Sequence, residues 1–333
     1  MGNARERVEA ALALDLADRP PVAAWGHDYE AEWDPEQLGR VTVERTRRLE
    51  FDLVKLQIRA CCFAEALGAG FRYSGSPDRE PVQVRPAVAA VEDWASLPQA
   101  SAATPALAEQ VRCLELVVRE VGPDVPVIQT LFSPVTVGGF LVGLDRARML
   151  SDLRARPDLV NPALERIAAA LVDFARASLE AGAAGVFYAI TGYASADAMP
   201  FVEYEELLLP LDRLVLDACS DGWLNMLHLC GPRQHFELVR RLPAHCVNWQ
   251  LQDPGNPGLA EVRDRYRRAV VGGLHRRSPI ADGTPDEVRR QAAAALAGTG
   301  GRGHVLTPGC SVSPWPYDRE ENFRALVESA YPA

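Results

Sequence analysis

The sequence lacks long apolar runs and an excess of positive charge. No apolar stretch approaches the roughly 18 residues that a membrane-spanning helix needs. The first residues lead into an amphipathic helix, which does not resemble the apolar segment of a signal peptide. The chain has 35 Lys and Arg against 45 Asp and Glu, a net charge of −10, which argues against a surface for nucleic acid or anionic membranes. We therefore expect a cytoplasmic protein that binds neither nucleic acid nor a membrane.

Disulfide patterns, nucleotide-binding loops and linkers are also missing. The seven cysteines are odd in number and have no disulfide-like spacing, which predicts free thiols in a reducing compartment. Neither a Gly-x-Gly-x-x-Gly motif nor a Walker loop follows the first strand-like run, and this disfavours a doubly wound nucleotide-binding sheet. No linker or low-complexity stretch divides the chain, so we expect residues 1–333 to form a single domain.

Short apolar runs that alternate with helical periodicity predict an α/β fold. The helical pattern is clear within Asp145–Glu180, and Thr284–Glu287 has the sequence of a helix N-terminus. Eight parallel strands alternating with helices predict one (β/α)₈ TIM barrel, with helical and loop decoration near the N-terminus. The eight expected strands are Pro21–Trp25, Leu53–Leu56, Val125–Phe132, Gly185–Ile190, Leu224–Cys230, Cys246–Leu251, Ala269–Leu274 and His304–Gly309.

Three metal-binding residue types fall at predicted strand ends. His228 and Cys230 are two residues apart on one strand, so their side chains point to the same side. Cys310 follows the last strand, and active-site groups of barrels lie at these ends. One imidazole and two thiolates suit zinc, with a fourth position left for water or substrate. For a His-x-Cys pair alone, a core cysteine beside a hydrogen-bonded histidine is the commoner explanation. With Cys310 at another strand end, spacing alone leaves both interpretations open.

Candidate catalytic residues follow other predicted strands. His27 follows the first, where it could supply a ligand, a proton or a substrate contact, or be an ordinary loop histidine. Arg59 follows the second and could pair with an anionic substrate group through its planar guanidinium. Tyr193 follows the fourth. Lys55, inside a predicted strand, must be paired or point into the barrel mouth.

Several local motifs together resemble one known superfamily. The motifs are Arg5–Val8 with Asp18–Val22, Phe51–Lys55 with Ala64–Gly68, Ser133–Thr136, Gly272–Leu274, and Gly309–Val312 followed by Pro314. With them the chain resembles the uroporphyrinogen decarboxylase superfamily over nearly its whole length. The resemblance implies the barrel fold already expected.

Two branches of that superfamily differ at the residues that matter. The decarboxylases carry arginines after strand one, an Asp after strand two and a His in the closing motif. Here Trp25–Tyr29 contains no arginine, Arg59 stands in place of the Asp, and Cys310 replaces the His. The methylcobamide:thiol methyltransferases, which include the coenzyme M enzymes, have a zinc motif of His-x-Cys and a later Cys after Gly. His228, Cys230 and Cys310 match it residue by residue.

The resemblance therefore implies a zinc-dependent methyltransferase. Zn²⁺ would lie on the His-Cys-Cys set, the acceptor or donor would be a small-molecule thiol, and methylcobalamin would be carried on a partner corrinoid protein. It also allows a homodimer. Two alternatives stay open: a decarboxylase or lyase that acts on a small acid, and a non-catalytic small-molecule-binding protein. The closing motif Pro314–Tyr317 departs from the usual Pro-x-Thr-Pro, which points to an altered substrate pocket.

Overall fold

A curled parallel sheet organises the molecule. The computed structural model describes residues 2–331, and its main sheet has seven strands in the order β1-β4-β5-β6-β7-β8-β9. Each neighbouring pair is parallel. The strands are β1 Val54–Leu56, β4 Val127–Phe132, β5 Gly185–Thr191, β6 Met226–Cys230, β7 Cys246–Trp249, β8 Ala269–Leu274 and β9 His304–Pro308. The predicted α/β class and seven of the eight predicted strands are thus confirmed.

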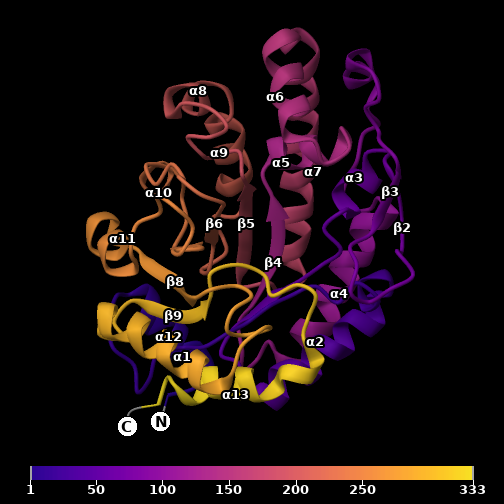
Figure 1. The fold of residues 1–333 in the computed structure, drawn as a ribbon. Coiled ribbons are helices and arrows are strands. Elements are labelled where there is room, and N and C mark those ends of the chain that lie inside the picture. Colours follow the sequence, from indigo (N-terminus) through magenta and orange to yellow (C-terminus); the bar gives the residue numbers. More distant parts are fainter. Residues whose placement is uncertain (1, 332–333) are drawn as a thin grey trace.

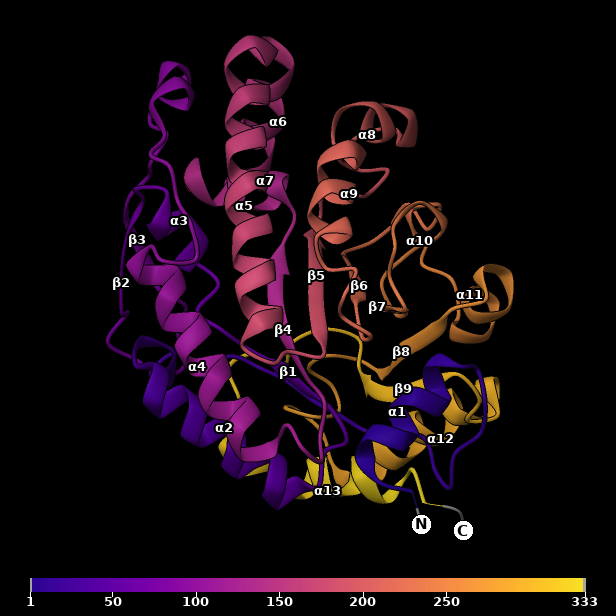
Figure 2. The same ribbon diagram turned by 180° about the vertical axis from the view of Figure 1, so that it is seen from behind.

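Helices cover the outer face of the curled sheet. Figures 1 and 2 show the strands from β4 to β9 following one another along a curve, with the helices outside it. All residues of β4 and β8 are buried, as expected for parallel strands that are covered on both faces. The carboxyl ends of the strands consequently surround one common space.

The eighth predicted strand, Pro21–Trp25, is not confirmed as a strand. Its residue Val22 forms only an isolated parallel bridge with Leu306 of β9. The Ala23 N–H donates to the Leu306 carbonyl (3.2 Å), and the Asp52 N–H donates to the Val22 carbonyl (2.8 Å). The segment begins with a proline, which has no N–H and so cannot extend the ladder in that direction. The described residues therefore form a curled seven-stranded sheet with an extended segment between its two edges.

The helices follow the predicted alternation. The helical segment expected within Asp145–Glu180 is divided at Arg156 into two helices. The predicted N-terminus at Thr284 is confirmed, because Thr284 and Glu287 form a capping box there. No helix among the described residues is long and apolar enough to cross a membrane. The α-helices are α1 Ala4–Leu12, α2 Pro35–Leu49, α3 Cys62–Ala66, α4 Pro105–Val121, α5 Pro134–Leu141, α6 Arg146–Ala155, α7 Pro157–Glu180, α8 Phe201–Leu207, α9 Leu209–Asp217, α10 Leu238–Arg241, α11 Leu259–Tyr266, α12 Pro285–Thr299 and α13 Glu320–Glu328; the short 3₁₀ helices are η1 Ala31–Trp33, η2 Val91–Ser96 and η3 Tyr317–Arg319.

A small hairpin decorates the first third of the chain. Strands β2 (Gly70–Arg72) and β3 (Val82–Arg85) pair antiparallel, apart from the main sheet. The sequence predicted only loops in this region. Figure 1 shows the hairpin beside α3, at the edge of the molecule. Phe71 of β2 and Pro81, just before β3, line the cavity described next, so the hairpin forms part of its wall.

Candidate metal centre and its cavity

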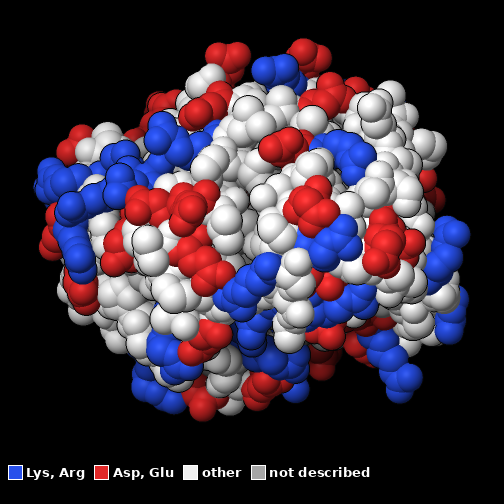
Figure 3. Space-filling view, turned by 90° about the horizontal axis from the view of Figure 1, so that it is seen from above, with Lys and Arg blue, Asp and Glu red and all other residues white. Residues whose placement is uncertain are grey.

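A cavity of about 510 Å³ lies among the carboxyl ends of the strands. One part of its wall is apolar, and the side chains there are Phe71, Phe132, Phe140, Leu144 and Phe187. Another part is polar, with His27, Glu32, Lys55, Gln57 and Ser311, and the predicted metal ligands also belong to the lining. Seen from above, the molecule's surface carries intermingled acidic and basic side chains (Figure 3), so neither sign of charge dominates that face.

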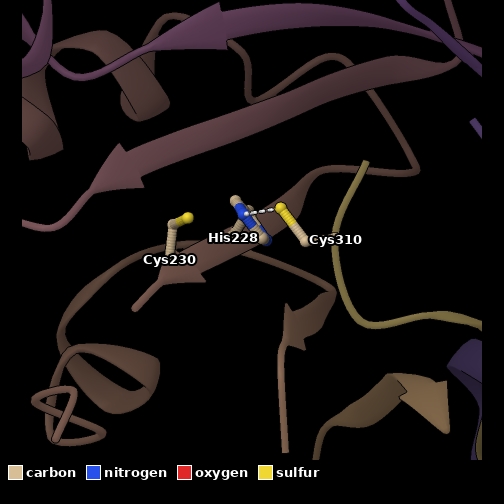
Figure 4. A group of neighbouring side chains, drawn as sticks. All are labelled: His228, Cys230 and Cys310. Carbon is tan, nitrogen blue, oxygen red and sulfur yellow. Dashed lines mark hydrogen bonds between the residues drawn. The ribbon is translucent and has the colours of Figure 1, made fainter. Parts of the chain in front are cut away.

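The three predicted metal ligands meet in this cavity. His228 and Cys230 lie on β6, and Cys310 lies just after β9 (Figure 4). One ligand atom from each lies within 4.8 Å of the others. The His228 Nε2 is 3.6 Å from the Cys310 Sγ. Tetrahedral zinc with ordinary bond lengths would separate a nitrogen and a sulfur ligand by about 3.6 Å, so the residues present fit this metal.

The two cysteines of this group have opposite pKa shifts. The nearby Cys230 thiol, and then His228, hold the pKa of Cys310 well below its ordinary value, although burial acts in the other direction. The proximity of Cys310, together with burial, raises the pKa of Cys230. The pair therefore favours one thiolate beside one thiol. A divalent metal would replace the remaining thiol proton, because bound cysteines are deprotonated.

The His228 ring is held in place by packing. It stacks on Phe187, with ring centroids 5.0 Å apart and an interplanar angle of 27°. The side chain is almost fully buried, and its Nδ1 has no hydrogen-bond partner among residues 2–331. Only Nε2 faces Cys310, so this nitrogen is the one available for a metal.

A network of five hydrogen-bonded side chains forms the polar part of the cavity. The Lys55 Nζ and the Ser311 Oγ both donate to the Gln57 Oε1. The Gln57 amide nitrogen then lies 2.8 Å from the His27 Nε2 and must donate to it. The His27 Nδ1 consequently carries the ring proton and donates it to the Glu32 Oε1, 2.6 Å away. This network fixes the tautomer of His27 and uses both of its nitrogens.

Two members of this network are buried charged groups. Lys55 is 4% exposed, and burial lowers its pKa to about 7. Its Nζ lies 4.5 Å from the centroid of the Phe187 ring, a cation–π arrangement. Glu32 is 2% exposed, and burial raises its pKa. The Glu32 Oε2 has no hydrogen-bond partner within the described part of the chain.

The three predicted catalytic residues are not brought together. His27 lines the cavity, whereas Arg59 and Tyr193 are absent from its lining. The Arg59 guanidinium donates to Glu65 (2.9 Å), to Glu109 (3.0 Å) and to the carbonyl of residue 32 (3.0 Å). Tyr193 is buried, and a Cβ built on Gly139 would lie 2.2 Å from its hydroxyl. The structure therefore places Arg59 in an ion-pair network and Tyr193 beneath α5.

Other cavity residues were not selected from the sequence. Gln57 stands two residues after Lys55, and this period of two was the signal for a shared face. Arg276 is the second residue after β8, has an exposed side chain and lines the cavity, so its position near a strand end was also a signal. Glu32 lies in a 3₁₀ turn five residues after His27, and no sequence pattern indicated that the two would meet.

Comparisons with known proteins show the family to which the chain is related. The family model described as uroporphyrinogen decarboxylase (URO-D) matches residues 5–331. The methylcobamide:CoM methyltransferase MtaA of Methanosarcina barkeri is 26% identical over 311 residues, which cover 92% of this chain and 86% of the relative. The uroporphyrinogen decarboxylase of Ralstonia nicotianae is 30% identical over 318 residues, with 89% and 82% covered.

Solved structures share the fold. A methyltransferase from Methanosarcina mazei superposes with a TM-score of 0.81 at 21% identity, and the match covers 99% of this chain and 98% of the other. A B12-independent methionine synthase from Shewanella gives a TM-score of 0.61 at 14% identity, with 89% and 86% covered. At these identities the likeness shows a common architecture only.

Proposed function

The chain belongs to the uroporphyrinogen decarboxylase (URO-D) family, and on this premise we propose that it is a zinc-dependent methyltransferase with a thiol as one substrate. The methyl group would move between that thiol and a corrinoid or another small methyl donor. The observation that carries the proposal is the group of His228, Cys230 and Cys310, whose ligand atoms cluster within 4.8 Å on the cavity wall.

The three ligands would supply a site suited to thiol chemistry. Zinc bound there would hold a substrate thiol as its thiolate at neutral pH. The two cysteine thiolates offset the charge of the metal, so that a third sulfur keeps its nucleophilic character. His228 supplies a neutral nitrogen ligand through Nε2, and its packing on Phe187 sets the ring orientation.

The apolar wall of the cavity would shield the reacting sulfur and the methyl group. Phe132, Phe140 and Phe187 line the cavity, as do Phe71 of the hairpin and Leu144. Phe132 and Phe140 pack edge to face, with centroids 5.3 Å apart. Such a surface excludes water from one side of the site and has no side-chain group that could hydrogen-bond to a charged methyl donor.

The methyl donor is proposed to arrive on a second protein. A relative is named as a methylcobamide-dependent enzyme, and we extend that donor class to this chain. Methylcobalamin is much larger than a cavity of about 510 Å³, so it would have to approach from outside, held by a corrinoid protein. This partner, like a homodimer, stays a prediction.

Zinc analysis of matched cysteine variants tests the proposed metal centre. The purified protein should contain about one zinc per chain, and Cys310→Ala should lose most of it because one of three ligands is removed. Cys113→Ala is the control, since Cys113 is buried in α4, away from the cavity lining, and should keep its zinc. Unchanged zinc in Cys310→Ala would overturn the assignment.

A methylcobalamin demethylation assay with a panel of thiols then tests the reaction. Thiol-dependent loss of the methyl–cobalt bond, absent in Cys310→Ala, is the expected result. A decarboxylase or lyase that acts on a small acid is the second candidate, because Lys55, Arg276 and Arg277 place three basic side chains on the cavity wall. Turnover of a small carboxylic acid without any thiol would favour that second reaction.

A further inference from the structure

We propose that the polar end of the cavity recognises an amino-acid thiol, with its acid group on Lys55 and its amine on Glu32, while its sulfur reaches the metal-ligand group. This assignment rests on the proposed function, since it takes the thiol as given and specifies what else the molecule must carry. The proposal starts from two buried charged groups whose hydrogen-bonding capacity is not used within the protein.

Glu32 has one oxygen without a donor. Its Oε1 accepts from the His27 Nδ1 (2.6 Å) and from the Asp28 N–H (3.2 Å). Its Oε2 is buried and has no partner among residues 2–331, although the side chain lines the cavity. A buried carboxylate oxygen without a donor is costly, so a ligand N–H placed there would be strongly favoured.

Lys55 has donors without an acceptor. It is the only lysine among the 333 residues, and the other residues counted as Lys or Arg are all arginine. Its side chain is buried at the cavity wall. Of its three N–H donors, one is taken by Gln57, and the Phe187 ring lies beneath the ammonium. No carboxylate forms an ion pair with it in the described part of the protein. A ligand acid group would supply the missing acceptor and the missing charge.

The two groups are fixed relative to each other and to the metal ligands. Gln57 and His27 join Lys55 to Glu32 through hydrogen bonds that occupy their own polar atoms. The Ser311 hydroxyl, one residue after Cys310, donates to Gln57 at 3.1 Å. A ligand therefore meets one acceptor, one donor and the metal-ligand group on the wall of the same cavity.

An amine suits Glu32 better than a hydroxyl does. A hydrogen bond between two charged partners is roughly twice as strong as one between neutral groups. A zwitterionic ligand would also leave the charge of the polar end unchanged, because its amine and acid match Glu32 and Lys55 in turn. A thiol with an acid group alone would leave the Glu32 Oε2 unpaired.

The test uses the cobalt-substituted protein and a matched series of thiols. Sulfur binding to cobalt changes its absorption, so a dissociation constant is obtained for each ligand without turnover. The series is homocysteine, 4-mercaptobutanoate, which lacks the amine, and 3-mercaptopropylamine, which lacks the acid. We expect homocysteine to bind roughly ten- to hundredfold more tightly than either analogue, from the strength of a hydrogen bond to a charged group.

Two variants assign the preference to its residues. Glu32→Gln should weaken homocysteine to the level of 4-mercaptobutanoate and leave the analogue unchanged. Lys55→Met should weaken homocysteine and 4-mercaptobutanoate but not 3-mercaptopropylamine. Lysine-selective ¹⁵N labelling of the unmutated protein gives one side-chain signal, from Lys55. That signal should shift with homocysteine and 4-mercaptobutanoate more than with 3-mercaptopropylamine, which keeps the proposal testable if a variant does not fold.

The possible failures are distinct. Equal affinity for all three thiols, or equal shifts of the Lys55 signal, would overturn the amino-acid assignment and leave thiol binding at the metal standing. Equally tight binding of 2-hydroxy-4-mercaptobutanoate would overturn the role of the amine. If no thiol changes the cobalt absorption, the proposed methyl transfer to a thiol is itself overturned.

Discussion

Asp212 is a carboxylic acid held wholly inside the protein, between two tyrosines. The hydroxyls of Tyr188 and Tyr204 each donate to it at 2.6 Å. Burial raises its pKa to about 7, although both hydrogen bonds act in the opposite direction. The folded protein therefore keeps this proton to a higher pH than the unfolded chain, in which an Asp has a pKa of about 3.9.

This shift predicts a loss of stability on raising the pH. The stabilising contribution of protonated Asp212 is complete below about pH 4 and is lost as the pH rises to about 7, at up to about 1.4 kcal/mol per pH unit. Asp212→Asn cannot ionise. The difference in the free energy of unfolding between the natural protein and this variant should shrink by about 1–3 kcal/mol from pH 5 to pH 7.5, as measured by urea unfolding. A difference independent of pH would show that Asp212 titrates normally.

Individual site residues were predictable where a regular period applied. His228 and Cys230 share a face because strand side chains alternate, and Cys310 was found from its place after the last strand. Glu32 was missed because it meets His27 through an irregular turn. The placement of Arg59 was not predictable either, since its partners Glu65 and Glu109 lie on separate helices.

The loop after β9 carries Cys310 and is held against the segment that contains Gly26. The Val312 N–H donates to the Trp25 carbonyl, and the Trp315 N–H donates to the His27 carbonyl, both at 2.8 Å. A Cβ on Gly26 would lie 1.7 Å from the Val312 carbonyl oxygen. The obstacle is backbone, which cannot rotate away as a side chain can.

Gly26→Ala should therefore displace the loop together with Cys310. We expect a loss of about 1–3 kcal/mol in the free energy of unfolding, as in other overpacked sites, and weaker zinc binding in a competition titration with a chelator. Gly298→Ala is the control, because nothing lies within 4 Å of its added Cβ in α12. That variant should keep its zinc affinity and gain up to about 1 kcal/mol. If Gly26→Ala had the same free energy of unfolding and the same zinc affinity as the natural protein, the close contact between residue 26 and the Val312 carbonyl would be contradicted.

Elements with strong local signals were predicted well. The capping box at Thr284 and Glu287 is a short-range signal, and α12 begins where it indicated. The long helical segment divides at Arg156, immediately before a proline, which disfavours helical backbone at the preceding residue. The β2–β3 hairpin was missed because its strands are only three and four residues long and have no buried residue, although Val82–Arg85 alternates apolar and polar residues.

The arrangement of the whole sheet was predictable from the alternation of buried strands and amphipathic helices, but its closure was not. Seven runs became strands with nearly the expected bounds, whereas Pro21–Trp25 became an extended segment with one bridge. Closure depends on how the first and last parts of the chain meet, and Leu306 lies 284 residues from Val22. Local sequence contains no information on that distance.

Hydrogen exchange can establish how firmly Pro21–Trp25 closes the space between β1 and β9. Hydrogen bonds join this segment to the chain on both sides. The Ala23 N–H donates to the Leu306 carbonyl and the Leu306 N–H to the Pro21 carbonyl (2.9 Å), while the Asp52 N–H, just before β1, donates to the Val22 carbonyl. We expect these three amides to exchange as slowly as those of β8, because opening the segment on either side would expose the polar end of the cavity. His27 and Glu32 follow this segment directly, and Gln57 follows β1, so the segment sets their mutual position. Fast exchange at Ala23 and Asp52 beside slow exchange in β8 would show a sheet that opens at this edge, and the His27–Gln57 contact would then be made only in part of the population.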